Sequence, residues 1–312
     1  MIASGVAGRR ITDEVAQFAT LVGSDDPVAV EGNRTRWDAG GPATGSPRIV
    51  KAPAGVVQYQ PDEMTVKVLA GTTVAELDRA LAGEGQRTAL PQRGGTVGGA
   101  LAVGENHPHT LAVGALRTAV LKVTYVSADG KIVSGGGATV KNVSGFDIPR
   151  LIVGSLGTLG CIAEVILRTN PIPAVSRWFH TLADPFAIYN ELLAPAAVFW
   201  DGSATWLLLE GHEVDVDHQA SVAAGIGELT PVDGPPDEPG LHRWSLPPGE
   251  LQATMTKLEG PALASIGVGT IWATEPQPER PLSPAVEAIH DRMKTFFDPD
   301  RRLNPGRHPG RR

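Results

Sequence analysis

Glycine is concentrated in three short stretches of the first half of this chain, and this limits what those segments can fold into. The stretches lie around Gly32, at 94–99 and at 154–160. Where no Cβ is present, backbone N–H groups can come close to a phosphate or to a flat ring. The pattern therefore has two readings, a bound cofactor of dinucleotide size or the tight turns of a β-rich domain. Arg34 and Arg36, beside the first stretch, favour the cofactor.

The better-known nucleotide and hydrolase motifs are missing. The glycines at 135–137 are not followed by the Gly-Lys-Ser/Thr of a P-loop. Neither 94–99 nor 154–160 has the Gly-x-Gly-x-x-Gly spacing that opens the helix of a Rossmann domain. The Gly-x-Ser-x-Gly elbow of hydrolases does not occur either. A cofactor bound by these glycines therefore needs another kind of domain.

Charge and cysteine content exclude several further classes. The chain of 312 residues has 27 Lys and Arg against 34 Asp and Glu, a net charge of −7, without a basic run, so nucleic-acid binding is not expected. One cysteine, Cys161, allows no internal disulfide, Cys-based zinc site or iron–sulfur cluster, and predicts a cytoplasmic location. We expect no metal site. No export signal and no apolar run of about 18 residues is found, so we expect no transmembrane segment.

The chain changes character near Asn170-Pro171-Ile172-Pro173. Glycines dominate before this point, whereas most of the 26 prolines and 6 tryptophans follow it. A Pro-x-Pro sequence disfavours helix on both sides and is typical of an extended connection. We therefore predict two domains, 1–170 and 171–312.

Hydrophobic periodicity predicts alternating helices and strands. Helices are expected at 12–22, 74–81 and 284–296, the last with Val286, Ile289, Met293 and Phe296 on one apolar face. Residues 90–102 contain too many glycines for a regular element. Strands are expected at 27–30, 49–50, 56–59, 65–70, 118–126, 132–133, 161–167, 205–210 and 266–273.

Four segments together resemble one known family. They are Val30-Glu-Gly-Asn-Arg-Thr-Arg-Trp37, Gly95-Thr-Val-Gly-Gly-Ala-Leu-Ala102, the long stretch from Gly137 to Glu164 that contains Gly154-Ser-x-Gly-Thr-Leu-Gly160, and the tail Phe297-Asp-Pro-x-x-x-Leu-Asn-Pro-Gly306. The chain resembles the FAD-binding domains of the vanillyl-alcohol oxidase/PCMH type, and within them the FAD-binding E subunits of glycolate oxidase. This implies an α+β fold, in which an FAD domain of two α/β subdomains precedes a short α/β substrate or cap domain whose C-terminal tail returns to the flavin domain.

The resemblance also implies which residues contact a non-covalently bound FAD. The loop at 32–36 would hold the pyrophosphate, and the segment at 96–102 would line the flavin. Residues 142–147 would shape the pocket, and residues 157–162 would lie against the cofactor. The implied cofactor-binding residues are Gly32, Asn33, Arg34, Thr35, Arg36, Thr96, Val97, Gly98, Gly99, Ala102, Asn142, Gly145, Asp147, Gly157, Thr158, Gly160 and Ile162.

Catalytic residues are less well marked, because the chain departs from the family beside the flavin. Gly104-Glu-Asn-His-Pro-His-Thr110 stands where relatives have small residues, so His107 and His109 are candidate bases or candidate covalent tethers of the flavin, with a solvated loop as the alternative. Arg243 is a candidate ligand for a substrate carboxylate, with a surface arginine on an edge strand as the alternative. Cys161 is expected to be an inert core thiol.

The resemblance implies a flavin-dependent oxidoreductase, in which hydride passes from a small 2-hydroxy acid to flavin N5. Electrons would then pass to a partner. The expected partners are a second FAD-binding subunit and an iron–sulfur subunit, which could also hold the chain at the inner membrane. The alternative is a non-catalytic FAD-binding or scaffold subunit of such a complex.

Overall fold

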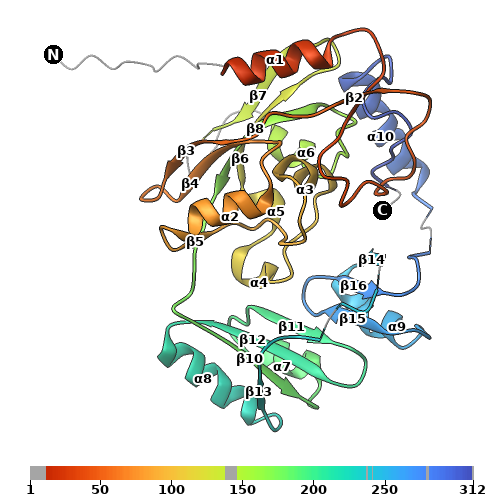
Figure 1. Ribbon diagram of the computed structural model, residues 1–312. Helices are drawn as coiled ribbons and strands as arrows, with labels where there is room; N and C mark the ends of the chain where they lie inside the picture. Colours follow the sequence, from red (N-terminus) through yellow and green to blue (C-terminus); the bar gives the residue numbers. More distant parts are fainter. Residues whose placement is uncertain (1–11, 138–145, 237, 241, 279–280, 311–312) are drawn as a thin grey trace, which may run out of the picture.

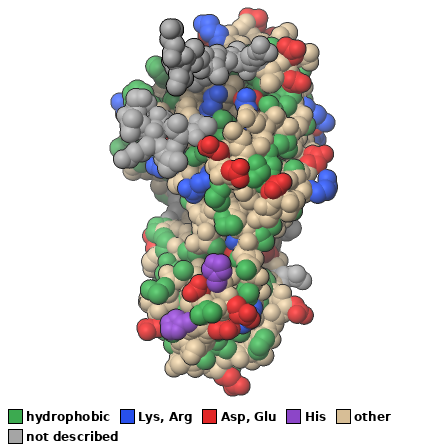
Figure 2. Space-filling model, turned by 90° about the vertical axis from the view of Figure 1, so that its left-hand side faces the viewer, with side chains coloured by type: hydrophobic (Ala, Val, Ile, Leu, Met, Phe, Trp, Pro, Cys, Tyr) green, Lys and Arg blue, Asp and Glu red, His purple; other side chains and the backbone are tan. Residues whose placement is uncertain are grey.

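The computed structural model describes residues 12–137, 146–236, 238–240, 242–278 and 281–310. Two lobes, one above the other in Figure 1, are each built on an antiparallel sheet covered by helices. Figure 2 shows the narrow waist between them. The α+β class predicted from the sequence is confirmed.

The upper sheet has five strands in the order β3-β4-β8-β6-β7. Gly130, with φ of +75°, makes the predicted tight turn between β6 and β7. The central strand β8 is buried along nearly its whole length, as expected for a strand with neighbours on both edges. The bounds are β3 (Val56–Gln60), β4 (Thr65–Leu69), β6 (Val120–Val126), β7 (Ile132–Gly136) and β8 (Cys161–Arg168).

Helices cover both faces of this sheet (Figure 1). On one face α1 (Asp13–Val22) buries Val15, Phe18 and Val22, the apolar positions of its 3.6-residue period. On the other face lie α2 (Val74–Ala82), α3 (Val97–Val103), α5 (Leu116–Ala119) and α6 (Ile148–Ile152), which enclose the main core of the lobe. The short helix α4 (Thr110–Val113) lies toward the lower lobe.

Helix α3 corrects the expectation that residues 90–102 form no regular element. The hydroxyl of Thr96 caps the helix by accepting a hydrogen bond from the N–H of Gly99 at 3.1 Å. Val97 and Leu101 are fully buried and supply the packing that outweighs the low helix propensity of glycine. Gly104 ends the helix in the left-handed conformation, with φ of +71°.

The last residues of the chain pack against its first strands. The parallel pair β1 (Val28–Val30) and β2 (Arg48–Val50) is extended by a bridge between Val28 and Leu303. The buried guanidinium of Arg302 donates to the carbonyl groups of Val22, Gly23, Asp26 and Ala128 at 2.7–3.2 Å. The C-terminal segment 298–308 therefore forms part of the upper lobe.

The lower sheet has seven strands in the order β13-β10-β12-β11-β15-β16-β14. The predicted strand at 266–273 begins only at Thr270, because Gly267 and Gly269 turn the chain with φ near +80°. A two-stranded pair, β5 (Gln86–Arg87) with β9 (Asn170–Pro171), lies where the chain leaves the upper lobe. The bounds are β10 (Val175–Thr181), β11 (Ala197–Trp200), β12 (Thr205–Gly211), β13 (Thr230–Val232), β14 (His242–Ser245), β15 (Ala262–Ser265) and β16 (Thr270–Ala273).

The two faces of the lower sheet differ in what they pack against. One face forms a core with α7 (Pro185–Glu191), α8 (Glu213–Ala224) and α9 (Leu251–Met255), which follows a 3₁₀ turn at Pro248–Glu250. The other face carries the aromatic side chains of Trp178, Phe199 and Trp272. The contact between α4 and β11, together with the ring contact between Trp178 and His109, places this aromatic face toward the upper lobe.

The last helix, α10 (Pro284–Phe297), returns to the upper lobe (Figure 1). Ser283 caps it and Pro284 occupies its first turn, so the predicted helix is confirmed. Its expected apolar face is not buried, since Val286 and Ile289 are 39% and 48% exposed. The helix is held instead by Lys294, whose Nζ donates to the carbonyl groups of Thr158 and Leu303 at 2.9 and 3.0 Å.

Candidate functional site

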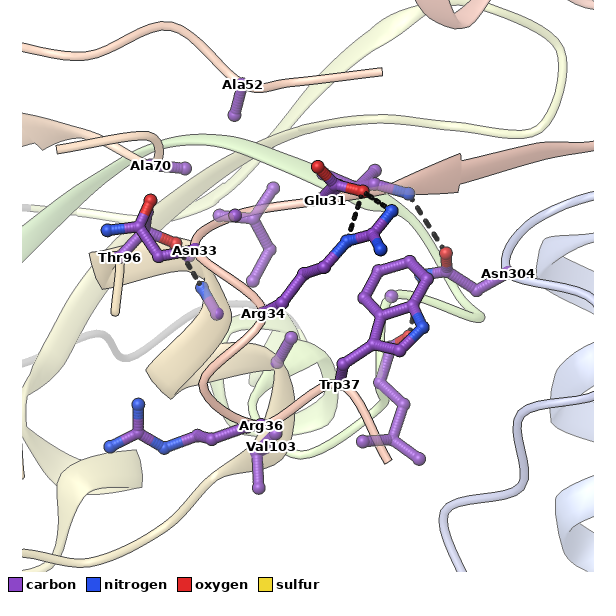
Figure 3. Close-up of a pocket in the computed structure, with 18 of the residues that line it drawn as sticks. Glu31, Asn33, Arg34, Arg36, Trp37, Ala52, Ala70, Thr96, Val103 and Asn304 are labelled. Atoms are coloured by element: carbon purple, nitrogen blue, oxygen red, sulfur yellow. Dashed lines mark hydrogen bonds and ion pairs between the residues drawn. The ribbon is translucent and has the colours of Figure 1, made fainter. Parts of the chain in front are cut away.

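A cavity in the upper lobe brings together most of the residues expected to bind a cofactor (Figure 3). It encloses about 1030 Å³, including space open to solvent, which is at the upper end of the range typical of cofactor sites. Its walls come from the loop after β1, the ends of β2 and β4, helix α3, the turn before β8 and the C-terminal segment. The expected residues that line it are Gly32, Asn33, Arg34, Thr35, Arg36, Thr96, Gly98, Gly99, Ala102, Gly157 and Ile162.

The loop after β1 presents a row of free backbone donors. The N–H groups of residues 32–36 donate no hydrogen bond to any residue that the structure describes. Backbone hydrogen bonding resumes on either side of this loop. The N–H of Glu31 donates to the carbonyl of Val50 at 2.8 Å, and the N–H of Trp37 donates to the carbonyl of Arg34 at 3.2 Å. Backbone N–H groups need a partner, and a curved run of free ones suits the oxygens of an anion. Amide groups of such a loop can donate hydrogen bonds to the oxygens of a diphosphate.

The charged side chains of this loop point in two directions (Figure 3). Arg34, in the left-handed conformation with φ of +57°, turns toward Glu31 and donates from Nε at 2.8 Å. Its guanidinium also lies 5.1 Å from the ring centre of Trp37, which Arg307 approaches to 4.7 Å. Arg36 points away from Arg34. Arg34 and Arg307 thus lie together at one end of the cavity, where Lys51 also approaches Glu31, at 3.7 Å.

Glycines of α3 allow close approach between backbone segments. A Cβ on Gly98 would lie 2.9 Å from the Cβ of Ala70, and one on Gly32 would lie 2.5 Å from the hydroxyl oxygen of Thr96. Glycine is therefore required here by packing as well as by any ligand. This packing role is separate from the two readings of the glycine pattern, a bound cofactor and tight turns.

Asn304 joins three walls of the cavity, and sequence reasoning assigned it no role beyond its place in the family-like tail. Its side-chain oxygen accepts a hydrogen bond from the N–H of Val30 at 3.0 Å. Its amide nitrogen donates to the carbonyl of Leu156 at 2.7 Å, beside Gly157. Only the fold reveals this role, because its partners lie more than 140 residues away. Further lining residues outside the expected set include Glu31, Trp37, Lys51, Ala70, Gly71, Val103, Leu156 and Arg307.

Other expected cofactor residues lie elsewhere. Val97 is in the core, Thr158 lines a second cavity beside α10, and Gly160 packs against the ring of Tyr125. Asp147 caps α6 and forms an ion pair with Arg150 at 3.0 Å. Asn142 and Gly145 lie outside the residues that the structure describes.

His107 and His109 lie between the lobes and do not line the cavity. Burial, followed by the charges of His109 and Arg87, lowers the pKa of His107 to about 3. Its Nδ1 accepts a hydrogen bond from the N–H of His109 at 2.9 Å. Burial also lowers the pKa of His109, although the carboxylate of Glu210, 3.7 Å from its Nδ1, opposes this. Both imidazoles are therefore neutral at pH 7, and their burial differs from the solvated loop considered as the alternative.

Arg243 is not a simple surface arginine. Its Nε lies 3.9 Å from Oε1 of Glu105, a carboxylate that also accepts hydrogen bonds from Arg36 Nε and Arg93 Nη1, both at 2.8 Å. Burial by itself raises the pKa of Glu105, but the hydrogen bond from Arg36 and the three guanidinium charges outweigh it and hold the pKa below its ordinary value. Glu105 is thus a buried carboxylate that links the cavity loop to the lower lobe.

The single cysteine matches its expected inert role. Cys161 is 1% exposed at the start of β8, on the wall of the cavity. Burial raises the pKa of its thiol to about 12, so the reactive thiolate is absent at neutral pH.

Two kinds of site are not found in the part of the chain that the structure describes. No group of three or more His, Cys, Asp or Glu side chains is placed to hold a metal ion. None of its helices is long and apolar enough to cross a membrane.

Comparison with known families and proteins agrees with the cofactor-sized cavity of the upper lobe. Residues 6–136 match the family model described as FAD binding domain. The chain is 27% identical to glycolate oxidase subunit GlcE of Escherichia coli K12, and the match covers 93% of this chain and 95% of that one. It is 28% identical to glycolate oxidase subunit GlcD of Bacillus subtilis over 63% of this chain, and 36% identical to a D-lactate dehydrogenase of Archaeoglobus fulgidus over 40%. It spans only 42% and 28% of those two proteins.

Solved structures show the same fold. An alkyldihydroxyacetonephosphate synthase matches 94% of this chain and 74% of its own, with a TM-score of 0.65 and 16% sequence identity. A variant of Phl p 4 matches 70% of this chain and 51% of its own, with a TM-score of 0.51. At these identities the likeness concerns the fold alone.

Proposed function

We propose that the chain, which is related to glycolate oxidase subunits and D-lactate dehydrogenases, is an FAD-linked oxidoreductase of the PCMH type and oxidises a small 2-hydroxy acid as one subunit of a glycolate-oxidase-like complex. The single observation that carries the proposal is the cavity whose loop 32–36 offers five unpaired amide donors among the described residues. FAD has the diphosphate that such a loop holds. When bound, FAD supplies a carbon-to-flavin hydride transfer.

The residues present fit FAD along the cavity. The amides of residues 32–36, with Arg34 and Arg307 nearby, would hold the diphosphate. The exposed surfaces of Gly98, Gly99 and Ala102 on α3, together with Gly157 and Ile162 across the cavity, would flank the flat rings. The proposed FAD is non-covalent, because no histidine lines the cavity among the described residues and the thiol of Cys161 is protonated.

The substrate class is inferred from the relatives, since two of them are D-lactate dehydrogenase and glycolate oxidase proteins by name. In the proposal His109, which is neutral at pH 7 and 25% exposed in its side chain, is the candidate base. The backbone N–H of His109 donates to Nδ1 of His107 and so orients the His107 ring, while Nδ1 of His109 lies 3.7 Å from the carboxylate of Glu210. Arg243 is the candidate carboxylate ligand once it is freed from Glu105.

The relative that this chain matches over nearly its full length is named as a subunit, so we propose that electrons leave to partner subunits. A second FAD-binding subunit and an iron–sulfur subunit are the proposed partners, and the complex is proposed to lie in the cytoplasm or at the inner membrane. The one cysteine of this chain provides too few thiolates for its own iron–sulfur cluster.

One observation favours a second candidate, a non-catalytic FAD-binding subunit. Arg243, the candidate ligand for the substrate carboxylate, already faces the carboxylate of Glu105. In that case the bound FAD would serve assembly or electron transfer alone.

Anaerobic reduction distinguishes the two candidates. The purified chain, loaded with FAD, is mixed with glycolate or D-lactate, and the flavin absorption near 450 nm is followed. Bleaching by one of the acids is the result that the proposal expects, with L-lactate as the control. An unchanged flavin spectrum with every acid contradicts catalysis by this chain alone and favours the second candidate; the same assay repeated with the partner subunits then decides between them.

A further inference from the structure

Three arginines from separate segments converge on Glu105 at the edge of the cavity. Arg36 belongs to the loop after β1, Arg93 precedes α3, and Arg243 lies on β14 of the lower lobe. Glu105 directly follows Gly104, the C-cap of α3, and is 5% exposed. A guanidinium fork matches a carboxylate in shape and charge, so this arrangement has the donor set of a carboxylate-binding site.

The cluster has more guanidinium groups than carboxylates. Three guanidinium groups face two carboxylates, since Arg93 Nη2 also contacts Glu238 at 3.0 Å. Nη2 of Arg36 is buried and has no hydrogen-bond partner among the described residues. A buried cationic donor without a partner is costly, and an added anionic oxygen would satisfy it.

We propose that Arg36, Arg93 and Arg243 form a subsite for a small carboxylate, which Glu105 fills in this chain as a built-in ligand. The subsite lies beside the cavity, because Arg36 lines the cavity while its guanidinium faces Glu105. It also spans the junction of the lobes, since Arg243 comes from the lower sheet. The identification of its ligand with a 2-hydroxy acid rests on the proposed function, but the binding of a carboxylate does not.

An attached carboxylate competes strongly with a free one. Glu105 is held beside the arginines by the chain itself, so its effective concentration exceeds the millimolar level of a dissolved acid. The unaltered chain is therefore expected to bind glycolate weakly at this place. Removing the Glu105 carboxylate leaves Arg36 and Arg243 without this carboxylate partner, while Arg93 keeps Glu238, and opens space for a ligand carboxylate.

Calorimetric titration of the full chain with glycolate tests this. Glu105→Ala is expected to bind glycolate more tightly than the unaltered chain by about tenfold or more. Neutral glycolamide shows no such gain, because it lacks the carboxylate. Glu238→Ala is the matched control, since it removes a carboxylate from the same cluster and leaves Glu105 in place, and it is expected to show no gain. Adding Arg243→Ala to Glu105→Ala is expected to abolish the gain.

A thermal-shift measurement covers the case in which Glu105→Ala is too unstable for titration. Glycolate is then expected to raise the Tm of Glu105→Ala, or of the smaller polar variant Glu105→Ser, more than that of the unaltered chain. The proposal is overturned when neither variant responds to glycolate more than the unaltered chain, or when the gain survives Arg243→Ala. The amount of bound FAD, read from its absorption, separately reports on the proposed function, so the two failures are distinguishable.

Discussion

Gly157, in the turn before β8, meets two separate constraints. Its φ of +68° is a conformation that side chains with a Cβ rarely adopt, and an added Cβ would lie 2.2 Å from Nδ2 of Asn304. Gly45 has nearly the same φ, +69°, but no atom within 4 Å of its Cβ position. Substitution of Gly45 therefore measures the cost of backbone strain alone, and substitution of Gly157 measures that cost together with the steric clash.

We expect Gly157→Ala to lower the free energy of unfolding by about 3 kcal/mol or more, and Gly45→Ala by about 1 kcal/mol. The larger loss has two sources, the strained backbone and the displaced Asn304, which holds Val30 and Leu156 together. Urea denaturation of both variants measures the difference. Equal losses would show that Asn304 moves aside without cost.

Single residues of the site were predictable chiefly through the resemblance to a known family. It implied that the backbone of residues 32–36 binds a pyrophosphate, and eleven of the seventeen residues that it assigned to the cofactor line the cavity. The partner of Gly157, Asn304, is 147 residues away in sequence, so no local pattern reveals it. The ion pairs of Glu105 were equally invisible, because they join three segments through the tertiary fold.

At the scale of elements, α2 and α3 begin with the same kind of cap. Thr73 accepts a hydrogen bond from the N–H of Glu76 at 3.1 Å, and Thr96 accepts one from that of Gly99 at 3.1 Å. Only Thr96 lines the cavity. Substitutions of the two threonines therefore distinguish the effect of a lost helix cap on stability from the effect of α3 on the cavity.

Replacement of either threonine by alanine is expected to cost about 1 kcal/mol of folding free energy, the usual effect of a lost N-cap. Thr96→Ala is also expected to weaken FAD binding, since the start of α3 forms a cavity wall, whereas Thr73→Ala leaves FAD binding unchanged. Thermal unfolding and fluorescence titration with FAD measure the two effects. Equal FAD affinity in both variants would contradict the role given to α3.

Elements with a clear period were predictable from the sequence, and elements decided by tertiary contact were not. Helix α1 and strand β4 follow their apolar spacing closely. Helix α3 was wrongly expected to be irregular, because buried packing around its glycines outweighs their low propensity. The sequence placed the apolar residues of α10 on one face but could not show that Ile289 on this face is 48% exposed, or that hydrogen bonds of Lys294 hold the helix.

For the whole molecule, the junction between the lobes holds polar groups in a buried setting. Arg87 of β5 donates to Glu210 of β12, with 3.1 Å between Nη1 and Oε1. His109 and the neutral His107 pack beside them. These groups, together with the aromatic face of the lower sheet, connect the lobes.

Stability is expected to fall in acid because of His107. Its pKa of about 3 in the folded chain is well below the unfolded value near 6.5, so the unfolded state binds a proton first as pH falls. The stabilising contribution of the neutral imidazole is complete above about pH 6.5 and is lost progressively toward pH 3. Urea unfolding at pH 7, 6, 5 and 4 measures the slope. His107→Asn is expected to flatten it, and an unchanged slope would assign the acid sensitivity to other groups.

The division into domains 1–170 and 171–312 remains a proposal. The upper sheet ends with β8 at Arg168 and the lower sheet begins with β10 at Val175, so the two sheets lie on either side of the proposed boundary. The tail 298–308 nevertheless packs in the upper lobe, a contact that composition could not reveal. The sequence therefore indicates which part of the chain forms each sheet, whereas only the fold shows that the C-terminal segment packs against the first strands.

Titration of the cofactor-free chain with FAD, ADP and riboflavin tests the central claim most directly, namely that the loop 32–36 holds the diphosphate of FAD. We expect one FAD to bind per chain, ADP to compete with it, and riboflavin, which lacks phosphate, to bind at least about tenfold more weakly. Quenching of flavin fluorescence measures the affinities. Riboflavin binding as tightly as FAD, or a chain that binds no FAD, would contradict the account.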